Sequence, residues 1–198
     1  MARTQAADYE ARRRRILDAA AELIAREGLA SASIAAIAER CGASKSLIYH
    51  YYAAKEDILF AVMQGHLTAL LTAARTVPTG PADARLQALA AALMREYAGA
   101  AASQKVLLNE LDRLPTERRA AIVAEQRELI GMVEGIVGEL APALDARQRF
   151  AAAMLFFGMV NWTHTWWNPA GALGADDMAA MAAGVFLGGV GPRIDDRG

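Results

Sequence analysis

The chain has 198 residues, 55% of them hydrophobic, and its 21 basic and 22 acidic side chains give a net charge of −1. That length fits one or two domains with a real core, and the overall charge by itself indicates nothing about nucleic acid. Cys41 is the only cysteine, which excludes an internal disulfide, disfavours a metal cluster and agrees with a reducing cytosol.

The charges are unevenly distributed along the chain. Residues 1–55 carry nine basic and six acidic side chains, whereas the remainder carries twelve basic and sixteen acidic ones. A mildly basic head on an acidic body suits a DNA-binding module joined to another part. Alanine is abundant and no run of alternating β-branched residues is found, so the sequence predicts an all-α fold.

The first predicted helix runs from about Tyr9 to Arg26 and ends at Gly28. Its buried stripe consists of Ile16, Leu17, Ala20, Leu23 and Ile24. The block Arg12–Arg15 is either a solvated helix start or an arm near phosphates. Four positive charges near a helix N-terminus interact unfavourably with the helix dipole, so both interpretations stay open. Asp18 and Glu22 interrupt the apolar stretch after this block, so we expect no signal peptide.

A helix-turn-helix is predicted next. Ser33 stands where an N-cap is needed, Gly42 can take the left-handed conformation that ends a helix, and Ser44 can cap the following helix. The helix between Ser33 and Gly42 has an apolar face made of Ile34, Ile37, Ala38 and Cys41. Two short apolar helices around a glycine-containing turn are typical of this motif.

The second helix of the motif, residues 45–52, has two distinct sides. Ile48 and Tyr52 fall on one side, and a helix this short must dock that side on a neighbour. The opposite side gathers Ser46, Tyr49 and His50, with Lys45 at its flank. These groups are donors for base edges and phosphates, which is the equipment for the major groove of DNA.

The run SKSLIYHYY at residues 44–52, followed by KEDIL at residues 55–59, resembles the signature of TetR (tetracycline-repressor-like) transcriptional regulators. That signature is roughly S-K-G-T-L-Y-H-Y-F and then K-E-E-L, so Ser46 replaces the usual Gly and Leu47 the usual Thr. The resemblance covers about the first sixty residues strongly. It implies DNA contacts from Ser33, Ser44, Lys45, Ser46, Leu47, Tyr49, His50 and Lys55.

The rest of the chain is predicted to be helical, and every proline falls between or just outside the predicted helices. The expected helices span about 55–76, 82–101, 103–114, 116–140 and 146–167. A last helix is expected to begin after Asp176-Asp177 and to run to about Gly189. The most apolar run, Ala151 to Val160, is shorter than the roughly 20 residues that span a bilayer, so no membrane contact is expected.

The last two predicted helices are apolar around much of their circumference, so they need burial on more than one side. A two-fold interface between copies would satisfy this need, and TetR-like proteins dimerise in this way. The pattern and the resemblance together predict a homodimer through the two C-terminal helices.

The resemblance also implies that the body binds a small-molecule effector. Residues 156–167 are similar to a branch of the family that senses acyl-CoA thioesters. The phosphates of such a ligand would need cations, and the candidates are Arg113, Arg118, Arg119 and Arg127, for which a solvated helix face is the alternative role. Most of the apolar candidates have core packing as the alternative role. The predicted effector-binding residues are Met94, Tyr97, Asn109, Arg113, Phe156, Met159, Asn161, Trp162 and Trp166.

An enzyme is disfavoured. His50, His66 and His164 have no metal-ligand spacing, and Glu110 and Asp112 diverge on a helix and cannot act as a facing acid–base pair. We therefore expect no catalytic residue, metal or cofactor. A helical adaptor without DNA binding stays as the alternative.

The sequence predicts an all-α, cytoplasmic, one-component regulator with about nine helices, and we expect it to act as a repressor. Residues 1–54 form the helix-turn-helix DNA-binding domain, and residues 55–198 form the effector-binding and dimerisation domain. The homodimer is expected to bind a palindromic operator whose half-sites lie about one helical turn apart, and a small organic effector to release it.

Overall fold

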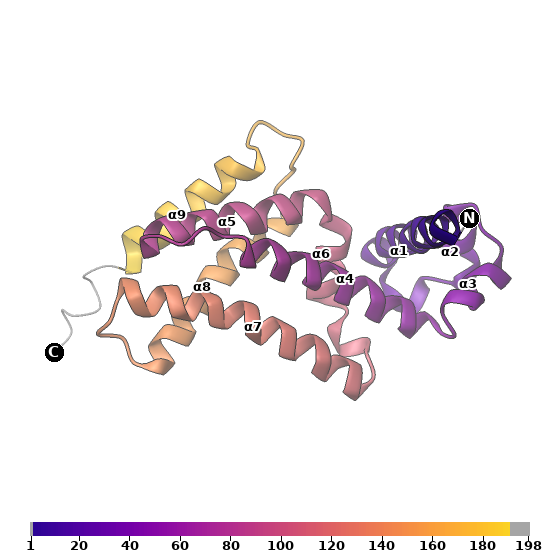
Figure 1. Cartoon of the computed structure of the whole chain (residues 1–198), viewed down its shortest axis with the longest axis horizontal. Coiled ribbons are helices and arrows are strands. Elements are labelled where there is room, and N and C mark those ends of the chain that lie inside the picture. Colours follow the sequence, from indigo (N-terminus) through magenta and orange to yellow (C-terminus); the bar gives the residue numbers. More distant parts are fainter. Residues whose placement is uncertain (1, 191–198) are drawn as a thin grey trace. The chain divides into compact units, whose positions relative to one another are not determined.

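The structure is a computed structural model that describes residues 2–190, with side chains for residues 7–189. Over these residues it contains helices and no strand (Figure 1), which confirms the predicted all-α fold of about nine helices. The α-helices are α1 (Ala2–Ser31), α2 (Ile34–Cys41), α3 (Lys45–Tyr51), α4 (Lys55–Arg75), α5 (Ala82–Gly99), α6 (Ala101–Asn109), α7 (Thr116–Leu140), α8 (Ala146–Trp162) and α9 (Ala175–Val190). Two short 3₁₀ helices cover Leu111–Arg113 and Thr163–Thr165.

The predicted capping residues of the helix-turn-helix are confirmed. The Ser33 hydroxyl accepts a hydrogen bond from the Ala36 amide and the Ser44 hydroxyl accepts one from the Leu47 amide, both at 3.1 Å. Gly42 has φ 65° and ψ 33°, the left-handed conformation that ends α2. The turn is therefore fixed by local chemistry on both sides.

The break at Gly28 is also confirmed, but α1 differs from the prediction at both ends. Gly28 has φ 78° and ψ 158°, a backbone conformation that an L side chain rarely adopts, and a short helical segment continues beyond it to Ser31. The helix begins at Ala2, seven residues before the predicted start at Tyr9. Arg12–Arg15 consequently lie well inside α1, beyond the first turn to which the dipole argument applies.

Two other predicted helices end early. The helix expected to reach Trp167 leaves α-helical geometry after Trp162, where the Thr163 hydroxyl donates to the Val160 carbonyl at 2.6 Å and the Thr165 hydroxyl to the Trp162 carbonyl at 2.8 Å. Such side-chain bonds to the preceding turn compete with the helical ladder. The helix expected at 103–114 ends at Asn109 and continues as a 3₁₀ turn.

The chain divides into two compact units, and α4 and α7 each contribute to both. The first unit comprises the residues up to Leu67 together with Ala102–Ile122. The second comprises Thr68–Ala101 and the residues from Val123 onward, where α9 packs on α5 and α8. Phe156 of α8 is fully buried in the second unit, with its ring centroid 5.4 Å from that of Phe186.

α4 is long and apolar enough, by length and composition, to cross a membrane. In this structure 56% of its apolar window is buried, and Ile58, Leu59 and Met63 are fully inaccessible to solvent. The apolar character of α4 is therefore that of a core helix in the part of the chain that the structure describes.

One buried histidine gives the fold a pH dependence. His66 is 5% exposed and its Nε2 lies 2.7 Å from Oε1 of Gln104. Burial lowers the pKa of His66 below its ordinary value, and the hydrogen bond to Gln104 offsets this only in part. The unfolded chain therefore takes up a proton more readily than the folded chain when the pH falls.

We expect the free energy of unfolding to decrease as the pH falls through about 6.5, the ordinary pKa of histidine, with a slope of up to about 1.4 kcal/mol per pH unit from this group. Urea titrations at a series of pH values would measure it. His66→Gln should remove this component of the slope, whereas His50→Gln, at an exposed histidine, should retain it. Equal slopes for His66→Gln and wild type would contradict the assignment.

Candidate nucleic-acid interface

α3 is docked on its neighbours through one side. Ile48 is 0% exposed and Tyr52 is 8% exposed, so the side predicted to be buried is buried. A seven-residue helix has too few internal hydrogen bonds to persist alone in water. The burial of Ile48 and Tyr52 therefore sets which side of α3 faces outward.

The outward side of α3 carries the predicted polar groups. Lys45, Ser46, Tyr49 and His50 are all exposed, and Tyr49 retains 56% of its accessible surface. This row offers an ammonium, a hydroxyl, a phenol and an imidazole from about two helical turns. A major groove admits a helix of this size, and these groups are donors for the base edges there.

Aromatic stacking ties α3 to α1. The Tyr51 ring lies 4.7 Å from the Tyr9 ring, centroid to centroid, and the His50 ring meets Tyr51 edge-on at 5.6 Å. Edge-to-face and tilted pairs at these distances are favourable. Tyr9 thus supports the orientation of His50 through Tyr51. The periodicity of the sequence gave no indication of the contact between Tyr9 and Tyr51.

Ser33 and Ser44 are exposed at the starts of their helices. In each capping bond the serine oxygen accepts from a backbone amide, so the hydroxyl proton is not used by that bond. Each serine can therefore cap its helix and donate to a phosphate at the same time. The predicted double role is chemically consistent.

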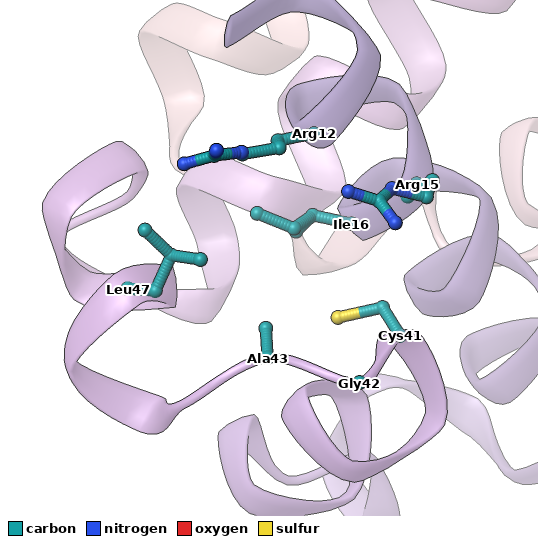
Figure 2. Close-up of a pocket in the computed structure, with 7 residues that line it drawn as sticks. All are labelled: Arg12, Arg15, Ile16, Cys41, Gly42, Ala43 and Leu47. Carbon is teal, nitrogen blue, oxygen red and sulfur yellow. The ribbon is translucent and has the colours of Figure 1, made fainter. Parts of the chain in front are cut away.

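Leu47 and Lys55 lie differently from the other predicted contacts. The half-buried Leu47 side chain points into a small pocket between α1 and the turn (Figure 2). The Lys55 ammonium lies 2.7 Å from the carbonyl oxygen of Leu29, 3.2 Å from that of Ala30 and 3.5 Å from that of Ala32. It caps the short segment after Gly28, so a phosphate would have to compete with three carbonyl groups for its protons.

The first turn of α4 is also held by a partner distant in sequence. The Asp57 carboxylate accepts a hydrogen bond from the Ala54 amide at 2.7 Å and pairs with Arg118 of α7, whose guanidinium lies 5.6 Å from the centre of the Phe60 ring. Burial raises the pKa of Asp57, but the hydrogen bonds from Arg118 and Ala54 and the charge of Arg118 outweigh it, so the pKa is lowered. Asp57 therefore stays ionised and fixes the entry to α4.

The predicted effector residues of the second unit include a part-buried polar pair. The Tyr97 hydroxyl donates to Oδ1 of Asn161 at 2.8 Å, and Met94 and Phe156 are fully buried. Met159 and Asn161 are half-buried. By contrast, Trp162 and Trp166 are 65% and 60% exposed.

The other two predicted effector residues, Asn109 and Arg113, belong to the first unit and are exposed. Arg113 lies 4.0 Å from the Glu110 carboxylate, and Arg119 pairs with Asp112 at 2.9 Å. With Arg118 bound to Asp57, three of the four arginines considered for phosphate groups are engaged in ion pairs within the protein. Within the described residues, no group of three metal-ligand side chains comes together.

The sequence matches two family models. Residues 16–62 match the model described as bacterial regulatory proteins of the tetR family, and residues 79–190 match the tetracyclin repressor-like C-terminal domain. The second match alone covers more than half of the chain. It includes all of α5, α6, α7, α8 and α9, so the similarity is not confined to the helix-turn-helix.

Individual relatives agree with the models. The chain is 36% identical over 101 residues to the HTH-type transcriptional regulator BetI of Escherichia coli O139:H28, a match that covers 49% of this chain and spans only about half (52%) of BetI. The crystal structure of a TetR-family transcriptional regulator from Bordetella parapertussis 12822 has a TM-score of 0.85 and 35% identity, over 88% of this chain and 93% of that one.

AibR, solved in complex with isovaleryl coenzyme A and operator DNA, has a TM-score of 0.75 and 26% identity, over 88% of this chain and 97% of that one. These relatives are regulators and not enzymes. The capped helix-turn-helix, the exposed polar side of α3 and the matches along most of the sequence lead to one conclusion: the chain belongs to the TetR family of DNA-binding transcriptional regulators.

Proposed function

We propose that this protein is a cytoplasmic, homodimeric repressor that binds a palindromic operator through α3 and leaves it when a small organic effector binds. In this proposal residues 1–54 are the DNA-binding domain and residues 55–198 bind the effector and dimerise. The observation that carries it is the two-sided α3: Ile48 is fully buried while Lys45, Tyr49 and His50 are exposed. The exposed row supplies donors of the kind that bind base edges and phosphates in a major groove.

The test is a gel-shift titration on the DNA upstream of the protein's own gene, with and without a panel of CoA thioesters and the corresponding free acids. A repressor of the proposed kind shifts this DNA, and one class of ligand releases it. An adaptor without DNA binding does neither, and that outcome would overturn the proposal.

Replacing Lys45 or Tyr49 with alanine is expected to weaken operator binding by about 1–3 kcal/mol, because each change removes a donor that faces the groove. Gel-shift titration measures the loss. Lys105→Ala is the matched control: it also removes one exposed lysine from the first unit, outside the helix-turn-helix. Affinities of the Lys45 and Tyr49 variants equal to that of Lys105→Ala would remove both residues from the interface.

Support for the homodimer comes from the exposed sides of α8 and α9. Large apolar side chains recur along these sides: Phe150, Met154 and Leu155 on α8, and Met181 and Val185 on α9. At Gly158, Gly184 and Gly188 an added Cβ would meet nothing within 4 Å, so this surface is open in a single chain. Apolar stripes interrupted by glycines suit close helix packing against a second copy.

For the effector we propose an acyl-CoA thioester, bound in the second unit by Met94, Tyr97, Phe156, Met159, Asn161, Trp162 and Trp166. Two observations support this class. Among the buried apolar side chains of the second unit, Tyr97 and Asn161 form a polar pair that can orient a ligand carbonyl. AibR, which resembles this chain over most of its length, binds isovaleryl coenzyme A.

A further inference from the structure

A small pocket lies beside the helix-turn-helix, where α1 faces the turn between α2 and α3 (Figure 2). Its volume is about 170 Å³. α1 contributes Arg12, Arg15 and Ile16, and the lining from the turn and α3 consists of Cys41, Gly42, Ala43 and Leu47. The pocket therefore adjoins α3, since Leu47 of that helix lines it.

The two arginines give the pocket its charge. Arg12 and Arg15 stand three residues apart on α1 and therefore share one side of the helix. Figure 2 shows both guanidinium groups reaching over the pocket, with Ile16, Ala43 and Leu47 around it. Two like charges at this spacing repel each other, and a shared anion would relieve that repulsion.

Among the described side chains, Arg15 has no carboxylate partner. Arg12 pairs with Asp8, and Arg13, on another side of α1, lies 3.6 Å from Glu10. No aspartate or glutamate among the side chains of residues 7–189 lies within 4.0 Å of the Arg15 guanidinium. Of the two positive charges at the pocket, that of Arg15 is therefore not neutralised by a described carboxylate.

The lining of the pocket indicates which anion suits it. The amides of Gly42 and Ala43 already donate to backbone carbonyls of α2, Gly42 to Glu39 at 3.2 Å and Ala43 to Ala38 at 2.8 Å. A free phosphate would find no backbone donors there and would meet apolar side chains on the other sides. A phosphate of a nucleic-acid backbone needs fewer donors, because other contacts along the strand hold it in position.

We propose that Arg12 and Arg15 bind a backbone phosphate of the same duplex whose groove α3 enters. This inference rests on the proposed function and adds a contact outside the helix-turn-helix. The planar guanidinium group donates two parallel hydrogen bonds to phosphate oxygens, which is why arginine suits this role. A phosphate contact positions the protein and carries no base specificity, so it acts equally on operator and on random duplex.

The test measures binding to a fluorescently labelled random duplex and to an upstream fragment by anisotropy, between about 50 and about 200 mM salt. Arg15→Ala should lower the slope of log affinity against log salt by about 0.9 and weaken binding to both duplexes about five-fold at 0.15 M salt. Arg14→Ala is the matched control, because Arg14 is exposed on the same helix but does not line the pocket. It should change both quantities much less.

The outcomes separate the two proposals. Equal effects of Arg15→Ala and Arg14→Ala would overturn the phosphate contact, since only net charge would then matter. If wild type bound the upstream fragment no better than random duplex, the proposed operator function would fail, while the difference between Arg15→Ala and Arg14→Ala would still report the contact. Absence of binding to either duplex at the lowest salt would overturn both. Thermal unfolding of each variant checks that it is folded.

Discussion

Ile48→Ala is expected to lower the free energy of unfolding by about 2–5 kcal/mol, the range for removing most of a large aliphatic side chain from a core. Ile48 is 0% exposed and is the one residue within the Lys45–Tyr51 helix that is fully buried. Because α3 is too short to persist alone, losing this side chain removes the contact that fixes its orientation. Urea unfolding measures the stability, and gel shift should show weaker operator binding in parallel.

The control for Ile48→Ala is Ile48→Val, which keeps the branched shape and should cost only about 0.5–1.5 kcal/mol. Tyr49→Ala, one residue later, should hardly change stability because Tyr49 is 56% exposed. A stability loss at Tyr49 as large as that at Ile48 would mean that the two sides of α3 have been assigned the wrong way round.

Leu155→Arg and Val185→Arg are each expected to convert the proposed dimer into folded monomers. The two side chains are 69% and 68% exposed in the single chain, so an arginine there leaves the fold intact. In a two-fold interface each change is repeated by symmetry, and an unpaired guanidinium buried among apolar groups costs about 3 kcal/mol or more. That corresponds to at least about a hundred-fold weaker association, which analytical ultracentrifugation would measure.

Ala124→Arg, at an exposed position of α7, adds the same charge elsewhere and should leave the mass in solution unchanged. Operator affinity should fall with dimerisation in the two interface variants, because two heads must act together on a palindromic site. Dimers that persisted in both Leu155→Arg and Val185→Arg would show that α8 and α9 do not form the interface.

Local sequence chemistry was sufficient for much of the fold. Ser33, Gly42 and Ser44 act through atoms within three or four residues of themselves, so their capping roles could be predicted and are confirmed. The helix predicted at 116–140 matches α7 at both ends, where Pro115 precedes it and Pro142 lies two residues beyond it. Proline and glycine mark such boundaries regardless of tertiary context.

The contacts that the sequence did not reveal join residues far apart in the chain. Lys55 meets carbonyl groups 23 to 26 residues earlier, and Arg118 meets Asp57 across two intervening helices. Periodicity indicates which side of a helix is buried, but it does not indicate which charged group on a neighbouring element contacts that helix. The exposure of Lys45, Tyr49 and His50 could be predicted because periodicity identifies the solvent-facing side of a helix. Their contacts with DNA stay predictions.

The position of the Lys55 ammonium affects how residues 1–54, the proposed DNA-binding domain, would behave as an isolated fragment. A peptide ending at residue 54 would lack the amine that caps the carbonyl groups of Leu29, Ala30 and Ala32, and it would also lack the Glu110 carboxylate that lies 3.4 Å from the Leu29 amide. The segment after Gly28 would lose its anchors on both sides. A truncated fragment that is meant to keep the helix-turn-helix folded should therefore include α4 and residues 102–122.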